Sequence, residues 1–218
     1  MMASANLTPS ASGLIARAAS LRVDIGSERI WSGVDLSAEP GDTIAVIGPN
    51  GAGKSVLLSC LAGAHDPDSG TIEVVNPGVG YLPQADLLPT SLTGREAVAF
   101  LGRIDCRLSD RWIDLAETFD IAHALDRPLD SYSIGMRRKL ELASVLGTDA
   151  ALYVLDEPTA GLDPESLPLV REAIADRTAD GAAVVYSSHR QDDIDAADRR
   201  LLVEEGRVVS AESREVEP

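Results

Sequence analysis

Residues 48–55, Gly-Pro-Asn-Gly-Ala-Gly-Lys-Ser, have the composition and spacing of a phosphate-binding loop. The apolar run 43–47 before them predicts a buried strand, and apolar positions at helical spacing follow over 55–62. In this context the glycines let several backbone N–H groups point at one anion, and the helix N-terminus adds its positive dipole end. Lys54 would reach the β- and γ-phosphates of a nucleotide, and the Ser55 hydroxyl would ligate Mg²⁺. The flanking strand and helix disfavour the alternative, a glycine-rich turn with a chance lysine.

Two adjacent carboxylates, Asp156 and Glu157, follow the continuous apolar run 151–155. Such a run is typical of a strand buried on both faces of a parallel sheet, and ligands bind at the carboxyl ends of such strands. Asp156 fits a residue that holds Mg²⁺ through water, and Glu157 fits a general base that polarises an attacking water. The alternative is a charged turn that merely ends a strand.

His189 and Gln84 are weaker candidates. His189 follows the apolar run 182–187, and a position at the end of a parallel strand favours a side chain that faces the nucleotide. A lone histidine is nevertheless more often an ordinary surface or core residue. Gln84 follows the segment 79–82, and a single glutamine in a loop indicates little by itself.

These residues require an α/β sheet to position them. The sequence pattern predicts short strands at 14–16, 21–25, 31–36, 43–47, 71–75, 79–82, 151–155 and 182–187. It also predicts a terminal hairpin over 201–209. Residues 93–146 have an amphipathic helical pattern with Thr93 and Ser109 as N-caps. A further helix is predicted over 164–177, with Pro164 in its first turn. The prediction is a nucleotide-binding sheet with an antiparallel β part in front and a helical insertion.

Composition narrows the class of protein. The 218 residues are 44% hydrophobic, enough for one large α/β domain, and the net charge of −16 disfavours direct binding to nucleic acid or anionic lipid. The two cysteines, Cys60 and Cys106, have no metal-ligand spacing and suit a reducing cytosol. No apolar run approaches the ~18 residues that a membrane span needs, so we expect a membrane role only through a partner. Residues 1–13 lack the basic and apolar regions of a signal peptide.

Taken together, these segments resemble the ATP-binding subunit of ABC transporters. The resemblance covers roughly residues 14–209, and the motifs occur in the order and spacing of that family. The matches are residues 48–55 to Walker A, Gln84 to the Q-loop, 131–136 to the signature loop, 152–157 to Walker B, 160–163 to the D-loop and His189 to the H-switch. The fold implied is a P-loop NTPase of the ABC type, with a mixed core sheet, an antiparallel β subdomain and a helical subdomain.

The chain departs from the family at two places. The usual signature Leu-Ser-Gly-Gly-Gln is here Tyr132-Ser133-Ile134-Gly135-Met136, a form similar to the subgroup that serves ABC-2 export permeases. The family also stacks an aromatic ring on adenine, and the position that matches is Ile25. Trp31 lies at a different register.

The resemblance implies ATP and Mg²⁺ as ligands, with roles for particular residues. Catalytic roles fall to Glu157, His189 and Gln84, and Mg²⁺ ligation to Ser55, Gln84 and Asp156. The nucleotide-binding residues implied are Gly48, Pro49, Asn50, Gly51, Ala52, Gly53, Lys54, Ser55, Val56, Ser133, Gly135 and Ile25.

The resemblance also implies partners. Two ATPase subunits, as a homodimer or a heterodimer, would hold each ATP between the Walker A loop of one chain and the signature loop of the other, where the Ser133 hydroxyl and Gly135 N–H face the γ-phosphate. An integral membrane permease would dock near Gln84 and the helical segment, so the chain would be cytoplasmic and peripheral on the inner face of the membrane. The domains expected are a flexible N-terminus (1–13), an ABC ATPase domain (14–210) with a helical subdomain at about 90–146, and a flexible acidic tail (211–218).

Two other functions remain as alternatives. A soluble, non-transport ABC ATPase could act on ribosomes, DNA or cluster assembly. Translation-type members usually carry two ATPase halves, and DNA-repair members carry a long coiled coil, which the segment 55–133 does not contain. A regulator that has lost hydrolysis is disfavoured by the presence of Lys54, Asp156, Glu157 and His189.

Overall fold

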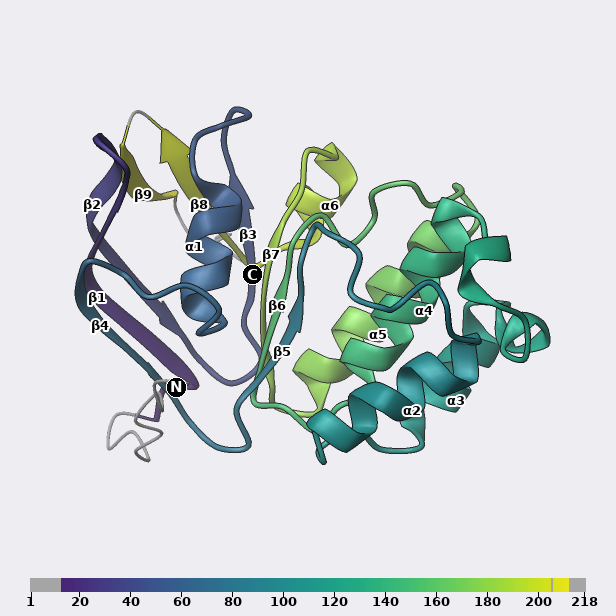
Figure 1. The fold of residues 1–218 in the computed structure, drawn as a ribbon. Coiled ribbons are helices and arrows are strands. Elements are labelled where there is room, and N and C mark those ends of the chain that lie inside the picture. The colour runs from purple at the N-terminus through teal and green to yellow at the C-terminus, as the bar shows by residue number, and fades with distance from the viewer. Residues whose placement is uncertain (1–12, 205, 212–218) are drawn as a thin grey trace.

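The computed structural model describes residues 13–204 and 206–211. The predicted flexible N-terminus and acidic tail therefore lie outside the described residues, apart from Gly13 and Ala211. The strands form a three-stranded and a six-stranded sheet, and a group of helices lies on one side of the larger sheet (Figure 1). This arrangement confirms the predicted α/β fold with an antiparallel β part and a helical part.

The smaller sheet is antiparallel and has the order β2-β1-β4. Its strands are β1 (Ala16–Ile25), β2 (Glu28–Ala38) and β4 (Ser69–Val74). The segments predicted as separate strands at 14–16 and 21–25 belong to one strand, β1. The pairing register shifts between Ala18 and Leu21, where Ser20 has a φ of 52°, so the alternation of apolar residues is interrupted although the strand continues.

The larger sheet has the order β5-β6-β7-β3-β8-β9. Its strands are β5 (Val79–Leu82), β6 (Leu152–Leu155), β7 (Ala183–Ser187), β3 (Thr43–Ile47), β8 (Arg199–Glu204) and β9 (Arg207–Ala211). All neighbouring pairs are parallel except β8 with β9, which form the predicted terminal hairpin. The carboxyl ends of β3, β5, β6 and β7 therefore meet at one edge of the sheet.

The position of strand β6 between two hydrophobic cores explains why its sequence is continuously apolar. Leu152 and Val154 pack into a core shared with the smaller sheet and helix α1 (Lys54–Leu61). Tyr153 and Leu155 point to the opposite face and pack with the helical side of the molecule. Since successive side chains of a strand alternate between faces, burial of both faces leaves no position for a polar residue.

The helical segment 93–146 consists of several short helices. They are α2 (Gly94–Ile104), α3 (Arg111–Thr118), the 3₁₀ turns Ala122–Ala124 and Leu129–Ser131, and α4 (Ile134–Leu146). The N-cap at Thr93 is confirmed, because Thr93 and Glu96 form a reciprocal capping box. The prediction for Ser109 is wrong: Asp110 precedes α3, and the Ser109 hydroxyl instead donates to the Gly147 carbonyl at 2.8 Å.

Two helices follow the strands β6 and β7. Helix α5 (Ser166–Ala179) begins later than predicted, and Pro168, rather than Pro164, lies in its first turn. Helix α6 (Gln191–Ala196) was not expected, because six residues are too few to produce a helical pattern of apolar positions.

Candidate nucleotide-binding site

The predicted phosphate-binding loop lies between β3 and α1 and is packed tightly against its neighbours. A Cβ atom at Gly48 would lie 2.1 Å from the Val203 carbonyl oxygen, and one at Gly53 would lie 2.5 Å from Ile30 Cγ2. Both glycines also have positive φ, 146° and 95°. Helix α1 begins at Lys54 without a side-chain cap, so its first N–H groups remain available to an anion.

Lys54 lies over the loop, and its side chain is almost fully buried. Its Nζ donates to the carbonyl oxygens of Gly48 at 2.9 Å and of Pro49 at 3.0 Å. Its neighbours in these hydrogen bonds are neutral carbonyls, so the ammonium charge attracts an anion at the loop. Ser55, the next residue, is exposed, and Val56 packs against the core.

The acid pair follows β6, and a serine from the adjacent strand β7 connects its two members. Asp156 is 2% exposed, and its Oδ1 accepts a 2.6 Å hydrogen bond from the Ser187 hydroxyl. The same hydroxyl accepts the backbone N–H of Glu157 at 2.9 Å. The sequence predicts Ser187 only as part of a strand. A small polar residue at the end of a buried strand was the available signal.

Glu157 and His189 contact each other at this edge. His189 Nε2 lies 3.1 Å from Glu157 Oε1, and the histidine is half exposed whereas the glutamate is mostly buried. Burial raises the pKa of Glu157, His189 and Lys54 lower it, and Asp156 raises it further. A raised pKa makes the carboxylate a better proton acceptor, which suits the predicted general base.

A buried carboxylate, Asp193 in α6, holds the segments on either side of this contact. It is 3% exposed and accepts hydrogen bonds from the hydroxyls of Thr159 at 2.7 Å and Ser188 at 3.0 Å, and from Arg171 Nε at 2.8 Å. Thr159 follows the acid pair and Ser188 precedes His189. Asp193 therefore fixes the two segments relative to each other, and its position in the sequence does not predict these contacts.

Gln84, Ser133 and Gly135 lie outside the phosphate-binding loop. Gln84 is exposed and follows β5, at the same sheet edge as the acid pair. Ser133 caps helix α4, where its hydroxyl accepts the Met136 N–H at 3.1 Å, and Gly135 is the second residue of that helix. Helix α4 and the phosphate-binding loop lie on opposite sides of the larger sheet (Figure 1), so the chain does not bring Ser133 and Gly135 to its own loop.

The position predicted to stack on the base has no aromatic residue. Ile25 ends β1 and is 51% exposed. Trp31 is fully buried, and its Nε1–H donates to the Gly53 carbonyl at 3.4 Å. Trp31 thus supports the loop within the core and presents no free ring face to a base.

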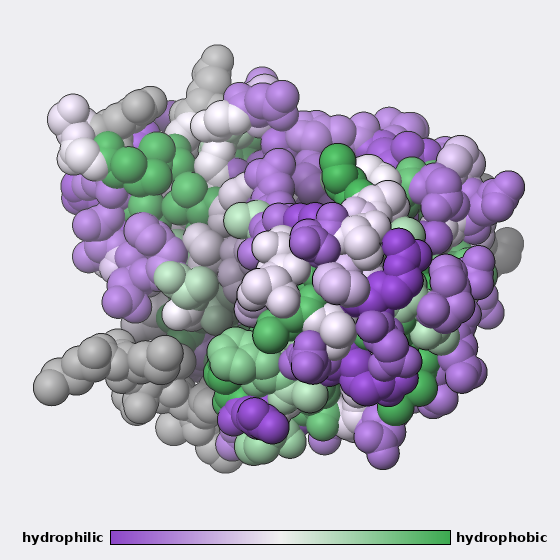
Figure 2. All heavy atoms as spheres, turned by 45° about the vertical axis from the view of Figure 1, so that its right-hand side comes forward, coloured by the Kyte–Doolittle hydropathy of each residue, from purple (hydrophilic) through white to green (hydrophobic). Residues whose placement is uncertain are grey.

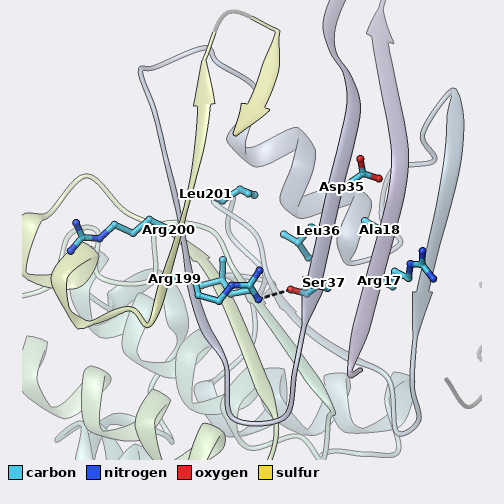
Figure 3. A pocket seen from close by; sticks show the side chains of 9 residues that line it. Arg17, Ala18, Asp35, Leu36, Ser37, Arg199, Arg200 and Leu201 are labelled. Atoms are coloured by element: carbon cyan, nitrogen blue, oxygen red, sulfur yellow. Dashed lines mark hydrogen bonds between the residues drawn. The ribbon is translucent and has the colours of Figure 1, made fainter. Parts of the chain in front are cut away.

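A hollow of about 350 Å³ between β1, β2 and β8 has three arginines in its lining (Figure 3). Arg199 donates to the Ser37 carbonyl and to Asp42 Oδ2, both at 2.8 Å, and Arg200 pairs with Asp195 at 2.7 Å. Figure 3 shows Arg17 and Arg200 directed away from each other. These side chains do not converge, so the hollow has no geometry for one anion.

The oxygen ligands that follow the carboxyl ends of β3, β5 and β6 fit Mg²⁺. The oxygen donors are the hydroxyl of Ser55, the carboxylate of Asp156 and the side-chain amide of Gln84. Mg²⁺ usually binds one or two protein carboxylates together with phosphates and water. The described part of the chain holds no cluster of three or more His, Cys, Asp or Glu side chains suited to a metal. Nucleotide phosphates would therefore have to complete the coordination.

The loop between β3 and α1, with an acid pair and a histidine at neighbouring strand ends, defines a P-loop nucleotide-binding protein. The ABC transporter family model matches residues 31–160, and the chain belongs to this family of ATP-binding proteins. The predicted resemblance is confirmed.

The chain is 34% identical over 201 residues to the daunorubicin resistance ATP-binding protein DrrA3 of Streptomyces coeruleorubidus, covering 85% of this chain and 64% of that protein. It is 33% identical over 183 residues to the cytochrome c biogenesis ATP-binding export protein CcmA of Gluconobacter oxydans (strain 621H), covering 84% of each. A solved ATP-binding subunit of an ABC transporter superposes with a TM-score of 0.82 at 23% identity, covering 90% of this chain and 89% of that one. The chain thus spans less than two thirds of the DrrA3 relative.

Proposed function

We propose that this chain hydrolyses ATP in the presence of Mg²⁺ and thereby drives export through a separate membrane permease. The contact between Glu157 and His189, beside the phosphate-binding loop, carries the proposal. A binding module would need the loop alone. A general base with a raised pKa, held against a histidine, is what hydrolysis needs in addition.

Each group at the carboxyl ends of these strands has a part in the proposed reaction. The residues from Gly48 to Val56 bind the phosphates, and Lys54 neutralises charge on them. Bound Mg²⁺ would supply further charge neutralisation at the phosphate oxygens, with Ser55, Asp156 and Gln84 as the residues that hold it. Glu157 accepts a proton from the attacking water, and His189 orients Glu157 and the γ-phosphate.

We propose that hydrolysis requires a dimer. Ser133 and Gly135 lie at the N-terminus of α4, where N–H groups and the helix dipole favour an anion, yet they lie away from the loop of their own chain. A second ATPase subunit, identical or different, would bring its loop to them. Ile134, between these residues, is 78% exposed, as expected of a surface that a partner covers.

The permease is proposed to dock on the helical side near Gln84. Hydrophobic patches interrupt the polar surface on this side (Figure 2), and Phe100 and Ile104 of α2 are 44% and 69% exposed. Beside them a hollow of about 210 Å³ between α2 and β5 includes Leu87 and Leu101 in its lining. Among residues 13–204 and 206–211, none of the helices has the length and hydrophobicity that crossing a bilayer requires. A separate membrane subunit, with this chain on the inner face of the membrane, accounts for these features.

The relatives favour the exporter over a soluble ABC ATPase. CcmA is named as an export protein, and another relative, 32% identical over 209 residues, is the Nod factor export ATP-binding protein I of Rhizobium meliloti. The domain division proposed from the sequence, 14–210 with a helical subdomain at about 90–146, fits a single ATPase unit of this kind.

Release of inorganic phosphate from ATP by the purified full chain tests the proposal. We expect a rate that depends on Mg²⁺, is lost in EDTA and rises more than linearly with protein concentration because the active species is a dimer. Lys54→Ala should lose both nucleotide binding and turnover. ATP binding without any hydrolysis, at every protein concentration and with the permease reconstituted, would refute the enzymatic part.

A further inference from the structure

Helix α4 inserts a buried arginine between two parts of the nucleotide site. Arg138 is 7% exposed, and its Nη1 donates to the Pro83 carbonyl at 2.9 Å. Its Nη2 donates to the carbonyls of Asp156 and Glu157, the latter at 3.1 Å. One guanidinium thus joins the backbone before Gln84 to the backbone of the acid pair.

Arg138 forms an ion pair with Glu141, on the same face of α4, and the charges of Asp156 and Glu157 add to the attraction. Glu141 is 2% exposed, and its Oε2 lies 3.4 Å from Arg138 Nη1. Its other oxygen, Oε1, accepts the Leu87 N–H at 2.8 Å. The segment 83–87, which contains Gln84, is therefore held at both ends by the same ion pair.

The backbone of Glu157 needs such support. Its φ of 50° places a non-glycine residue in the left-handed region, which costs free energy and persists only where the surroundings enforce it. Ser187 holds the N–H of Glu157 from β7, and Arg138 holds its carbonyl from α4. The two contacts on either side of Cα fix the direction in which the carboxylate leaves the backbone.

Burial of this charged pair costs free energy because both groups lose water. Desolvation lowers the pKa of Arg138, and Glu141 counteracts that effect. A buried ion pair is often no more stabilising than a hydrophobic pair of similar volume, whereas a guanidinium can hold several carbonyls in a fixed geometry.

We propose that Arg138, held by Glu141, is a positioning residue for ATP hydrolysis, which fixes Glu157 and the segment 83–87 to helix α4 as one unit. This inference rests on the proposed ATPase function. Arg138 does not touch the phosphates in this scheme. It acts through the backbone of Glu157, and its loss should therefore lower turnover without weakening nucleotide binding.

The test is Arg138→Lys in the full chain, which keeps a positive charge beside Glu141 but loses the planar fork that reaches two segments. We expect kcat for Mg²⁺-dependent ATP hydrolysis to fall about 10- to 100-fold, since small displacements of a reacting group have effects of this size, with KM for ATP changed less than about twofold. The same change in a Glu157→Gln background should lower the residual single-turnover rate less than about twofold, because residues that act through one group are not additive.

Arg177→Lys is the matched control. Arg177 is also a buried helical arginine, 8% exposed and paired with Asp180 at 3.3 Å, but it lies by the starts of β6 and β7, at the other end of these strands. It should retain wild-type kcat. If Arg138→Lys does not fold, the double variant Arg138→Met, Glu141→Leu removes the pair without leaving a lone buried charge and is judged by the same measurements.

Several results would overturn the inference. They are an unchanged kcat in the Arg138 variant, an equal fall in both Glu157 backgrounds, or an equal fall in Arg177→Lys. A wild-type chain that binds but never hydrolyses ATP would overturn the proposed function as well. Hydrolysis by the wild type at the same rate as Arg138→Lys would overturn this inference alone.

Discussion

Replacing Glu157 with glutamine should separate ATP hydrolysis from ATP binding in the proposed site. The amide keeps the size of the side chain and one oxygen acceptor for His189, but it cannot accept a proton from water. Removal of a general base costs about 10²–10⁴-fold in rate. At about 1.36 kcal/mol per factor of ten, this is about 3–5 kcal/mol of lost transition-state stabilisation. We expect ATP binding to persist and a dimer with trapped ATP to accumulate.

The folded state should tolerate this change. The pKa of Glu157 is raised by burial, so its contribution to stability is fully present below the pKa of the unfolded chain and is lost as pH rises through the folded pKa. The neutral amide removes this loss at neutral pH. The contact with His189 opposes the effect only weakly, because the histidine is 50% exposed and such pairs contribute about 0–1 kcal/mol. The variant should therefore match or exceed the thermal stability of the wild type at pH 7 and lose that advantage as pH falls.

Phosphate release, nucleotide titration and size-exclusion chromatography with ATP and Mg²⁺ measure these effects. Glu117→Gln, the same chemical change on the exposed surface of α3, is the control and should behave as the wild type. Wild-type turnover in Glu157→Gln would remove Glu157 from the role of base. A large fall in melting temperature would instead show that the carboxylate serves mainly to stabilise the fold.

Three further predictions concern the second ATPase subunit, the permease and the adenine base of ATP. Ser133→Arg should leave ATP binding by the monomer nearly unchanged and block hydrolysis, and hydrolysis at the wild-type rate would contradict a shared site. The chain alone should stay in the supernatant and sediment with membranes only when its permease is co-expressed; sedimentation without a permease would count against docking through a partner. Ile25→Tyr should tighten ATP binding several-fold and at most about tenfold, because aromatic pairing adds roughly 0.5–1.5 kcal/mol, while Lys54 remains essential. Calorimetric titration with ATP and GTP measures the effect of Ile25→Tyr. The wild type should bind the two nucleotides with similar affinity. Unchanged or weaker ATP binding in the variant would show that the adenine base does not lie against residue 25.

The sequence predicted the fold class because its strongest signals are local. The run 43–47 and the run 79–82 coincide with β3 and β5, since short apolar segments between turns form buried strands. The sequence pattern predicted helix starts wrongly where contacts with distant segments decide where the helix begins. Ser109 has the type of an N-cap but bonds to Gly147. The start of α5 is held by Asp163, whose Oδ1 accepts the Ser166 N–H at 2.9 Å, rather than by Pro164.

The same distinction applies to the site. The positions of Lys54 after β3 and of Glu157 after β6 could be predicted, because each residue lies in a short motif with a chemical reason for its spacing. Ser187, Asp193 and Arg138 could not, because their function depends on which segments lie beside them in the folded chain. Ser187 and Arg138 contact the acid pair from 31 and 18 residues away. A local pattern does not show which distant segment such a residue contacts.

The first turns of α4 show how far the site depends on these distant contacts. Arg137 pairs with Asp86 at 2.8 Å, and Lys139 pairs with Asp163 at 3.1 Å. Arg138, between them, reaches Pro83 and the acid pair. Three consecutive side chains of one helix thus contact the segment that contains Gln84, the end of β6 and the turn before α5. Because Arg138 is buried whereas Asp86 and Asp163 are at least half exposed, the outer two pairs contribute little to stability. The central contact is the one through which a displacement of α4 would reach Glu157.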